Sequence, residues 1–227
     1  MFAVIFEVNP KPDKWDAYLG YAKALRPELL QVDGFIDNIR YRSKRREGWL
    51  LSLSSWRDEK ALVRWRTHVM HHEIQKKGRF EIFRDYHLRV GRVTTDMHIP
   101  DGQNSREQCL DETETSVAKM LSIIEMQRPI DLSDNASAEV FADHFDLHKS
   151  ADGFVEWDIF EAILTPGDFL LLLAGQNARS AEQANLRVAG RERRIRVIRD
   201  YGMYDRYEAP QYYPNVIRPA DTICHKE

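Results

Sequence analysis

The tetrapeptide Asp33-Gly34-Phe35-Ile36 returns 119 residues later as Asp152-Gly153-Phe154-Val155. The tripeptide Arg84-Asp85-Tyr86 likewise returns as Arg199-Asp200-Tyr201, at an offset of 115 residues. Patterns that recur in the same order at almost the same separation indicate internal duplication. We therefore interpret the chain as two copies of one structural unit.

Each copy has the pattern of a β-α-β-β-α-β unit, because stretches with the alternation of strands enclose stretches with helical spacing. We expect helices over residues 13–30 and 57–78 in the first copy and over residues 138–148 and 179–190 in the second. The expected strands cover residues 2–8, 35–42, 49–56, 80–93, 120–126, 154–164, 169–174 and 194–204.

The predicted organisation is a first repeat over residues 1–97, a polar linker over 98–116, a diverged second repeat over 117–207 and a tail over 208–227. A β-α-β-β-α-β unit is ferredoxin-like and carries both helices on one face of its sheet. The other face is bare and must be covered. We therefore predict an α+β fold in which the two repeats pack sheet to sheet as an intramolecular dimeric barrel, with a pocket between each sheet and its own helices.

The composition narrows the classes of function. The chain has 227 residues, with 33 Lys and Arg against 36 Asp and Glu, so its net charge of −3 provides no basic field for nucleic acid. The apolar run over residues 169–174, which no other run exceeds, is far shorter than the roughly 20 residues of a membrane span. We expect a cytoplasmic protein with no nucleic-acid or membrane partner.

The expected second helix of the first copy carries the residues best suited to chemistry. At about 100° per residue, Trp65 and His72 share one face and His68 lies on its flank, whereas His71 points elsewhere. A tryptophan beside imidazoles offers an aromatic substrate a flat wall and a base that titrates near neutrality. The alternative interpretation is a buried core tryptophan with structural histidines.

The stretch SLSSWRDEKAL over residues 52–62, followed by Trp65-Arg66, resembles the antibiotic biosynthesis monooxygenase (ABM) domain. The similarity continues upstream and downstream, through Asp33-Gly34-Phe35-Ile36, His68, His71, Gln75, Gly78-Arg79, Phe83, Asp85-Tyr86 and residues 88–90. It covers residues 1–95 well and implies a dimeric α+β barrel. In this family, the implied activities are cofactor-free oxygenation of polycyclic phenols and, in one branch, oxidative cleavage of haem.

The sequence departs from both branches at informative positions. The haem branch places an axial histidine ten residues after the helix tryptophan, where this chain has Gln75, and an asparagine on the first strand, near Phe6 or Glu7 here. The aromatic-oxygenase branch places an asparagine four residues before the strand-end tryptophan, where this chain has Ser52 before Trp56.

Our leading hypothesis is a cofactor-independent monooxygenase that acts with O2 on a small aromatic substrate in the first repeat. We predict that His68 or His72 is the base and that Trp65, Trp56, Asn38 and Ser52 bind substrate. No spacing of ligands indicates a metal site. The alternatives are a non-catalytic protein that binds a hydrophobic ligand and a haem-binding or haem-degrading enzyme. The sequence leaves further self-association open.

Overall fold

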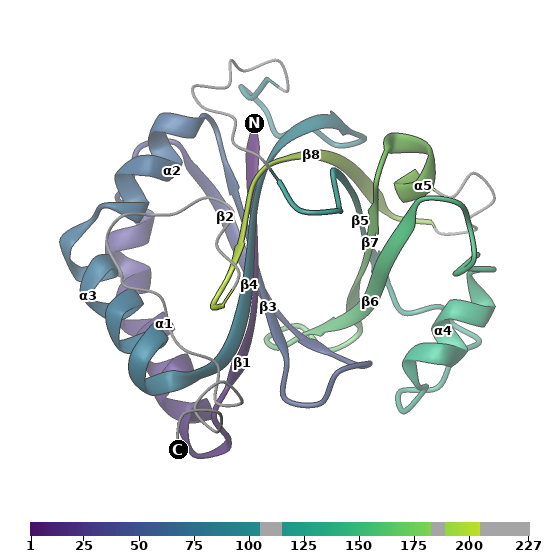
Figure 1. Cartoon of the computed structure of the whole chain (residues 1–227), viewed down its shortest axis with the longest axis horizontal. Coiled ribbons are helices and arrows are strands. Elements are labelled where there is room, and N and C mark those ends of the chain that lie inside the picture. Colours follow the sequence, from purple (N-terminus) through teal and green to yellow (C-terminus); the bar gives the residue numbers. More distant parts are fainter. Residues whose placement is uncertain (105–114, 183–188, 205–227) are drawn as a thin grey trace, which may run out of the picture.

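Eight antiparallel strands close into one barrel within residues 1–104, 115–182 and 189–204, which are the residues that the computed structural model describes. Around the barrel the strands follow the order β1-β3-β2-β6-β7-β5-β8-β4 (Figure 1). Their bounds are β1 Phe2–Pro10, β2 Phe35–Ser43, β3 Leu50–Trp56, β4 Phe83–Asp96, β5 Met120–Gln127, β6 Phe154–Ala162, β7 Asp168–Gly175 and β8 Arg191–Gly202.

The barrel consists of two halves with the same strand order. The first half runs β4-β1-β3-β2 and the second runs β8-β5-β7-β6, which is the ferredoxin-like arrangement. The two halves join edge to edge, through a long β4–β8 ladder and a short β2–β6 ladder over residues 41–43. The predicted fold of two ferredoxin-like repeats that form an intramolecular dimeric α+β barrel is therefore confirmed.

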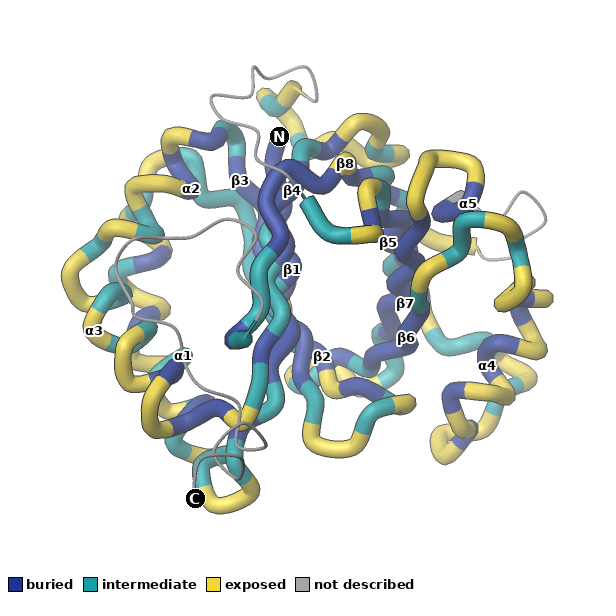
Figure 2. The backbone as a smooth tube through the Cα atoms, in the orientation of Figure 1, coloured by how far each residue is buried: buried dark blue, intermediate teal, exposed yellow. Residues whose placement is uncertain are grey.

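Helices cover the outer face of each half (Figures 1 and 2). The first half has α1 (Trp15–Leu30), α2 (Glu59–Arg66) and α3 (Val69–Lys77), with a 3₁₀ turn before α1 and a π-helical turn over Gly78–Ile82. The second half has the shorter α4 (Ala138–His144) and α5 (Ala178–Glu182). None of the described helices combines the length and apolar character that crossing a membrane requires.

The prediction of one continuous helix over residues 57–78 is wrong, because the structure has two helices there, and this difference affects the site. Helix α2 begins after the N-cap Asp58, whose side chain accepts from the Ala61 amide, and it ends before α3. His68 has extended backbone angles, with φ −61° and ψ 130°, so α3 starts with a new rotational phase. The helices of the second half are also shorter than expected. Part of the expected 179–190 helix and the 208–227 tail lie outside the described residues.

Successive side chains along each strand point alternately into the barrel interior and toward the helices. On β1, Ile5 and Glu7 face the interior, whereas Val4 and Phe6 face the helices and line the pocket described below. The interior is filled by a core to which both halves contribute, including Ile5, Leu53, Phe160, Leu172 and Ile195. The barrel is therefore a packed core and the space for a ligand lies outside it.

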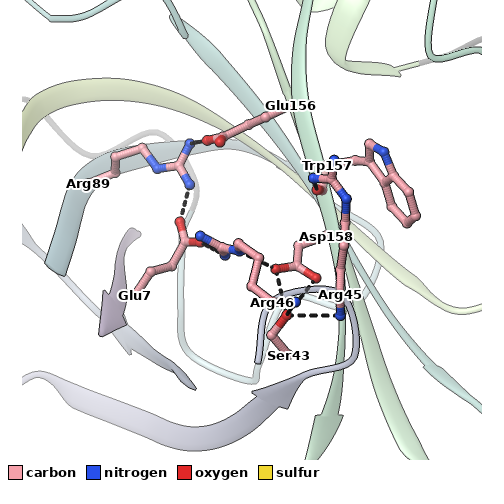
Figure 3. A network of polar contacts seen from close by, with 8 residues as sticks. All are labelled: Glu7, Ser43, Arg45, Arg46, Arg89, Glu156, Trp157 and Asp158. Carbon is pink, nitrogen blue, oxygen red and sulfur yellow. Dashed lines mark hydrogen bonds and ion pairs between the residues drawn. The ribbon is translucent and has the colours of Figure 1, made fainter. Parts of the chain in front are cut away.

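Buried ion pairs connect the halves inside the barrel (Figure 3). Glu7 of β1 pairs with Arg89 of β4 and with Arg46 of the β2–β3 loop. Arg46 Nε lies 2.7 Å from Asp158 Oδ2, and Arg89 Nη1 lies 2.7 Å from Glu156 Oε1, so both arginines reach β6 of the second half. Since a charge buried without partners is very costly, this network favours one alignment of the halves.

Candidate active site

A pocket of about 230 Å³ lies between the sheet of the first half and helices α1 to α3. Its floor is formed by the helix-facing residues of the strands, among them Phe6, Asn38, Ser52 and Trp56. We refer to this space as the helix-side pocket. It is the kind of cavity that was expected between a ferredoxin-like sheet and its own helices.

Aromatic side chains form much of the pocket lining. Trp56 is 1% exposed, packs edge-on against Phe35 with ring centroids 5.4 Å apart and donates its Nε1–H to Ser54 Oγ at 2.9 Å. Phe6 and Tyr86 contribute a second aromatic surface, with ring centroids 5.8 Å apart. Such walls bind a mostly apolar ligand, and the few polar groups among them determine its orientation.

His71 is the histidine that the structure brings to this pocket. Its ring stacks on Trp65 with centroids 4.3 Å apart and an interplanar angle of 14°. Its Nδ1 lies 2.8 Å from the carbonyl oxygen of Trp65. Because a carbonyl oxygen only accepts hydrogen bonds, Nδ1 carries the proton and Nε2 retains its lone pair.

Burial lowers the pKa of His71 to about 4, against a smaller opposing effect of its hydrogen bond to Trp65. The imidazole is therefore neutral at physiological pH. A neutral imidazole with an oriented Nδ1–H keeps a free lone pair on Nε2, which can accept a proton from a bound substrate.

The predicted bases lie elsewhere. Neither His68 nor His72 is among the described residues that line the pocket. His68 precedes α3, and its Nε2 lies 3.6 Å from Glu28 Oε2 of α1. The expectation that His71 points elsewhere is wrong, because that prediction assumed one unbroken helix, whereas the helix breaks at His68. The signal that would have indicated His71 is that break, which residue spacing alone does not reveal.

The predicted substrate-binding residues Trp65, Trp56, Asn38 and Ser52 all line the pocket. Asn38 Nδ2 donates to Ser52 Oγ at 2.9 Å and to the Leu53 carbonyl at 3.0 Å, which determines the orientation of the amide. Its Oδ1 is buried and has no hydrogen-bond partner among the residues that the structure describes. An unpaired buried acceptor is costly, so this oxygen is available for a donor group on a ligand.

The sequence did not indicate that the second half contributes to this pocket. The β4–β8 ladder brings Arg199 and Tyr201 of β8 into the lining. Arg199 forms a buried ion pair with Glu59, and Asp200 accepts from His87 Nε2 at 2.6 Å. The repeated Arg-Asp-Tyr motif therefore takes part in contacts between the strands of the two halves.

The corresponding space in the second half is occupied by side chains. Phe141 and Phe145 of the α4 region pack against Trp157 and Phe169 of the sheet, and all four are buried. Ring centroids of Phe141 and Phe169 are 4.9 Å apart. The two halves share a fold but differ in what lies between sheet and helices.

The pocket residues do not fit haem ligation as the resemblance describes it. Gln75 stands at the axial position and lines the pocket, with its amide nitrogen 3.1 Å from His71 Nδ1. The ring of His71 is held flat against Trp65. Elsewhere, Glu7, His87 and Glu156 offer ligand atoms within 4.8 Å of one another, but Arg46 and Arg89 already neutralise Glu7. Two arginines next to this carboxylate disfavour a metal cation there.

Comparisons with known proteins identify relatives of this chain. Residues 1–77 match the family model described as antibiotic biosynthesis monooxygenase. The chain is 45% identical over 221 residues to "Jasmonate monooxygenase ABM" of Pyricularia oryzae, which covers 94% of this chain and 99% of that protein. Among solved structures, an aldoxime dehydratase superposes with a TM-score of 0.52 at 10% identity, over 86% of this chain and 80% of the other. That likeness concerns the fold alone.

Proposed function

Because this chain belongs to the antibiotic biosynthesis monooxygenase family, we propose that it transfers an oxygen atom from O2 to a jasmonate-like substrate in the helix-side pocket. Jasmonate is a cyclopentanone with a carboxylate arm and an unsaturated hydrocarbon arm. The proposal differs from the aromatic substrate expected from the Trp65 pattern. The near full-length similarity to a jasmonate monooxygenase supports this change, and aromatic side chains pack equally well on an aliphatic ring.

The observation that carries the mechanism is a neutral imidazole in an aromatic pocket. We assign His71 as the base, with Trp65 supporting its ring and the Trp65 carbonyl orienting Nδ1–H. This arrangement leaves Nε2 to remove a proton from a carbon acid of the substrate, such as a carbon next to a ketone. Trp56, Asn38 and Ser52 would then contact the substrate from the floor of the pocket.

The proposed route needs no bound cofactor. The carbanion left by proton removal transfers one electron to O2, and the superoxide combines with the carbon radical. The resulting peroxide takes back the proton from His71 Nε2 and becomes a hydroperoxide on that carbon. If that carbon carries a second hydrogen, loss of water leaves a carbonyl group. One oxygen atom then remains in the product, the other leaves as water, and the substrate supplies all the electrons.

The test is oxygen uptake with jasmonic acid, and with a polycyclic phenol as the competing substrate class, using protein whose absorption spectrum and metal content are recorded. We expect uptake with jasmonic acid and a product that has gained one oxygen and lost two hydrogens. Formation of a hydroxylated product only after a reductant is added would refute the cofactor-free route. Oxidation of the phenol but not of jasmonic acid would restore the aromatic substrate.

The base is tested by His71→Asn, because the Asn amide can still donate to the Trp65 carbonyl but cannot accept the proton. We expect kcat to fall by about a hundredfold or more. The matched controls are His68→Asn and His72→Asn, which change the two neighbouring histidines outside the pocket and should retain activity. Full activity in His71→Asn, or a comparable loss in either control, would refute the assignment. Binding of jasmonic acid without oxygen uptake would instead support the non-catalytic alternative.

A further inference from the structure

The charged residues of the helix-side pocket are all of one sign. Arg40, Arg66, Arg79 and Arg199 line it, and no aspartate or glutamate is among its described lining residues. In a cavity whose other lining residues are mostly aromatic or apolar, with a few neutral polar groups, such a set of cations attracts an anion and disfavours a cation.

Three of these arginines, Arg66, Arg79 and Arg199, have interaction partners. Arg199 is paired with Glu59, whose side chain is buried. Arg79 donates from Nη1 to the Tyr86 hydroxyl at 2.5 Å and from Nη2 to the Met203 carbonyl at 3.3 Å. These contacts explain Arg79 and Arg199 as parts of the framework.

Arg40 has no ion pair with a carboxylate among the residues that the structure describes, and its guanidinium contacts the hydroxyl of Tyr18. Its Nε is buried without a hydrogen-bond partner, as are the Nε atoms of Arg79 and Arg199. It lies on β2 opposite Ser52 of β3 and two residues from Asn38, so it belongs to the polar strip on the pocket floor.

The surroundings of Arg40 leave its charge uncompensated. It lies next to the hydroxyl of Tyr18, whose pKa is raised above its ordinary value because the side chain is buried. Tyr18 is therefore a neutral neighbour at physiological pH. The nearby Asn38 and Ser52 are neutral as well.

We propose that Arg40 binds the carboxylate of the substrate through its Nε and one Nη, and that it makes the enzyme specific for the free acid over esters and amides. A guanidinium presents parallel N–H groups that match the two oxygens of a carboxylate. Such a pair would satisfy the buried Nε–H and neutralise the charge in one contact. The inference rests on the proposed function, because it specifies the chemical group by which a jasmonate-like substrate is recognised.

The test compares jasmonic acid with its methyl ester in the wild type, Arg40→Gln, Arg40→Lys and Arg42→Gln. Arg42 is the matched control, because it lies two residues further along β2, is exposed and packs over Trp15 rather than in the pocket. We expect the wild type to prefer the acid in kcat/KM on the order of 10- to 100-fold, as a charged hydrogen bond predicts.

Arg40→Gln should abolish this preference, because KM should rise far more for the acid than for the ester, and Arg40→Lys should restore part of it. Arg42→Gln should resemble the wild type. Persistence of the acid preference in Arg40→Gln, or an equal loss in Arg42→Gln, would overturn the inference.

Calorimetric titration with both ligands separates this inference from the proposed function. Acid-selective binding that is lost only in Arg40→Gln supports the role of Arg40 even if no oxygen is consumed, in which case the monooxygenase proposal fails alone. Turnover of acid and ester with equal efficiency overturns the Arg40 inference and leaves the proposed function intact. A wild type that neither binds nor oxidises jasmonic acid overturns both.

Discussion

Replacing Arg89 by methionine tests whether the buried ion pairs hold the two halves together. The Arg89 side chain is 0% exposed, and it bridges Glu7 of its own half and Glu156 of the other (Figure 3). Burial raises the pKa of Glu7, but the charges of Arg89 and Arg46 outweigh this effect and hold the pKa below its ordinary value. Glu7 is therefore a buried anion that depends on these two arginines.

The size of the effect can be worked out from the contacts that remain. Removing one partner of a buried pair costs about 3–5 kcal/mol, because the other charge stays buried without compensation. Arg46 still contacts Glu7, and the partly exposed Glu156 can turn to water, so we expect the lower end, about 3 kcal/mol. With a urea slope near 3 kcal/mol/M for a chain of this size, the unfolding midpoint should fall by about 1 M.

The assay is urea unfolding followed by both circular dichroism and tryptophan fluorescence. Arg84→Met is the control, since Arg84 lies on the same strand and is exposed, and it should change stability by less than about 0.5 kcal/mol. Adding Glu7→Gln to Arg89→Met should recover part of the loss, because the unpaired anion is gone. A loss below about 1 kcal/mol in Arg89→Met, or no recovery in the double variant, would refute this explanation of how the halves are joined.

Three other predictions follow from the same structure. The pKa of His71 is about 4 and the neutral form is the base, so kcat/KM should be constant above about pH 5 and fall as the pH drops through 4; an acid limb near 6.5 would contradict this. Burial raises the pKa of Asp96, but the ion pair with Arg191 outweighs burial, so the pKa lies below its ordinary value of 3.8. The ion pair therefore stabilises the fold above pH 3.8, and this stabilisation is lost as the pH falls below that value. Urea midpoints of the wild type and Asp96→Asn should accordingly differ at neutral pH and converge in acid. Gly91→Ala should destabilise the protein by about 1–3 kcal/mol, because the new Cβ would lie 2.1 Å from Ile195 Cγ2. The control is Gly20→Ala in α1, whose Cβ would meet no atom within 4 Å and which should leave stability unchanged or raise it. Thermal denaturation of both variants measures the difference.

The limits of sequence-based prediction are clearest at His71 and Asn38. Asn38 was expected to bind substrate and lines the pocket, but its unpaired Oδ1 could not be inferred from the sequence. His71 was placed on the wrong face because a helical wheel assumes an unbroken helix, and the break depends on the backbone angles of a single residue, His68. The contribution of Arg199 and Tyr201 to the pocket was hidden for another reason, since it requires β8 to pair with β4 across the two halves.

The sequence by itself determined the duplication and the α+β class, and it predicted a candidate site in the first half. These properties follow from local patterns, in which alternating and helical spacings and repeated turn motifs dictate elements that must bury one face. Only the tertiary structure decided which imidazole enters the pocket, that Arg40 there has no carboxylate partner among the described residues, and which strand edges close the barrel. Those outcomes depend on contacts between residues far apart in the chain, and electrostatic interactions at such contacts are stronger in the buried interior than in water.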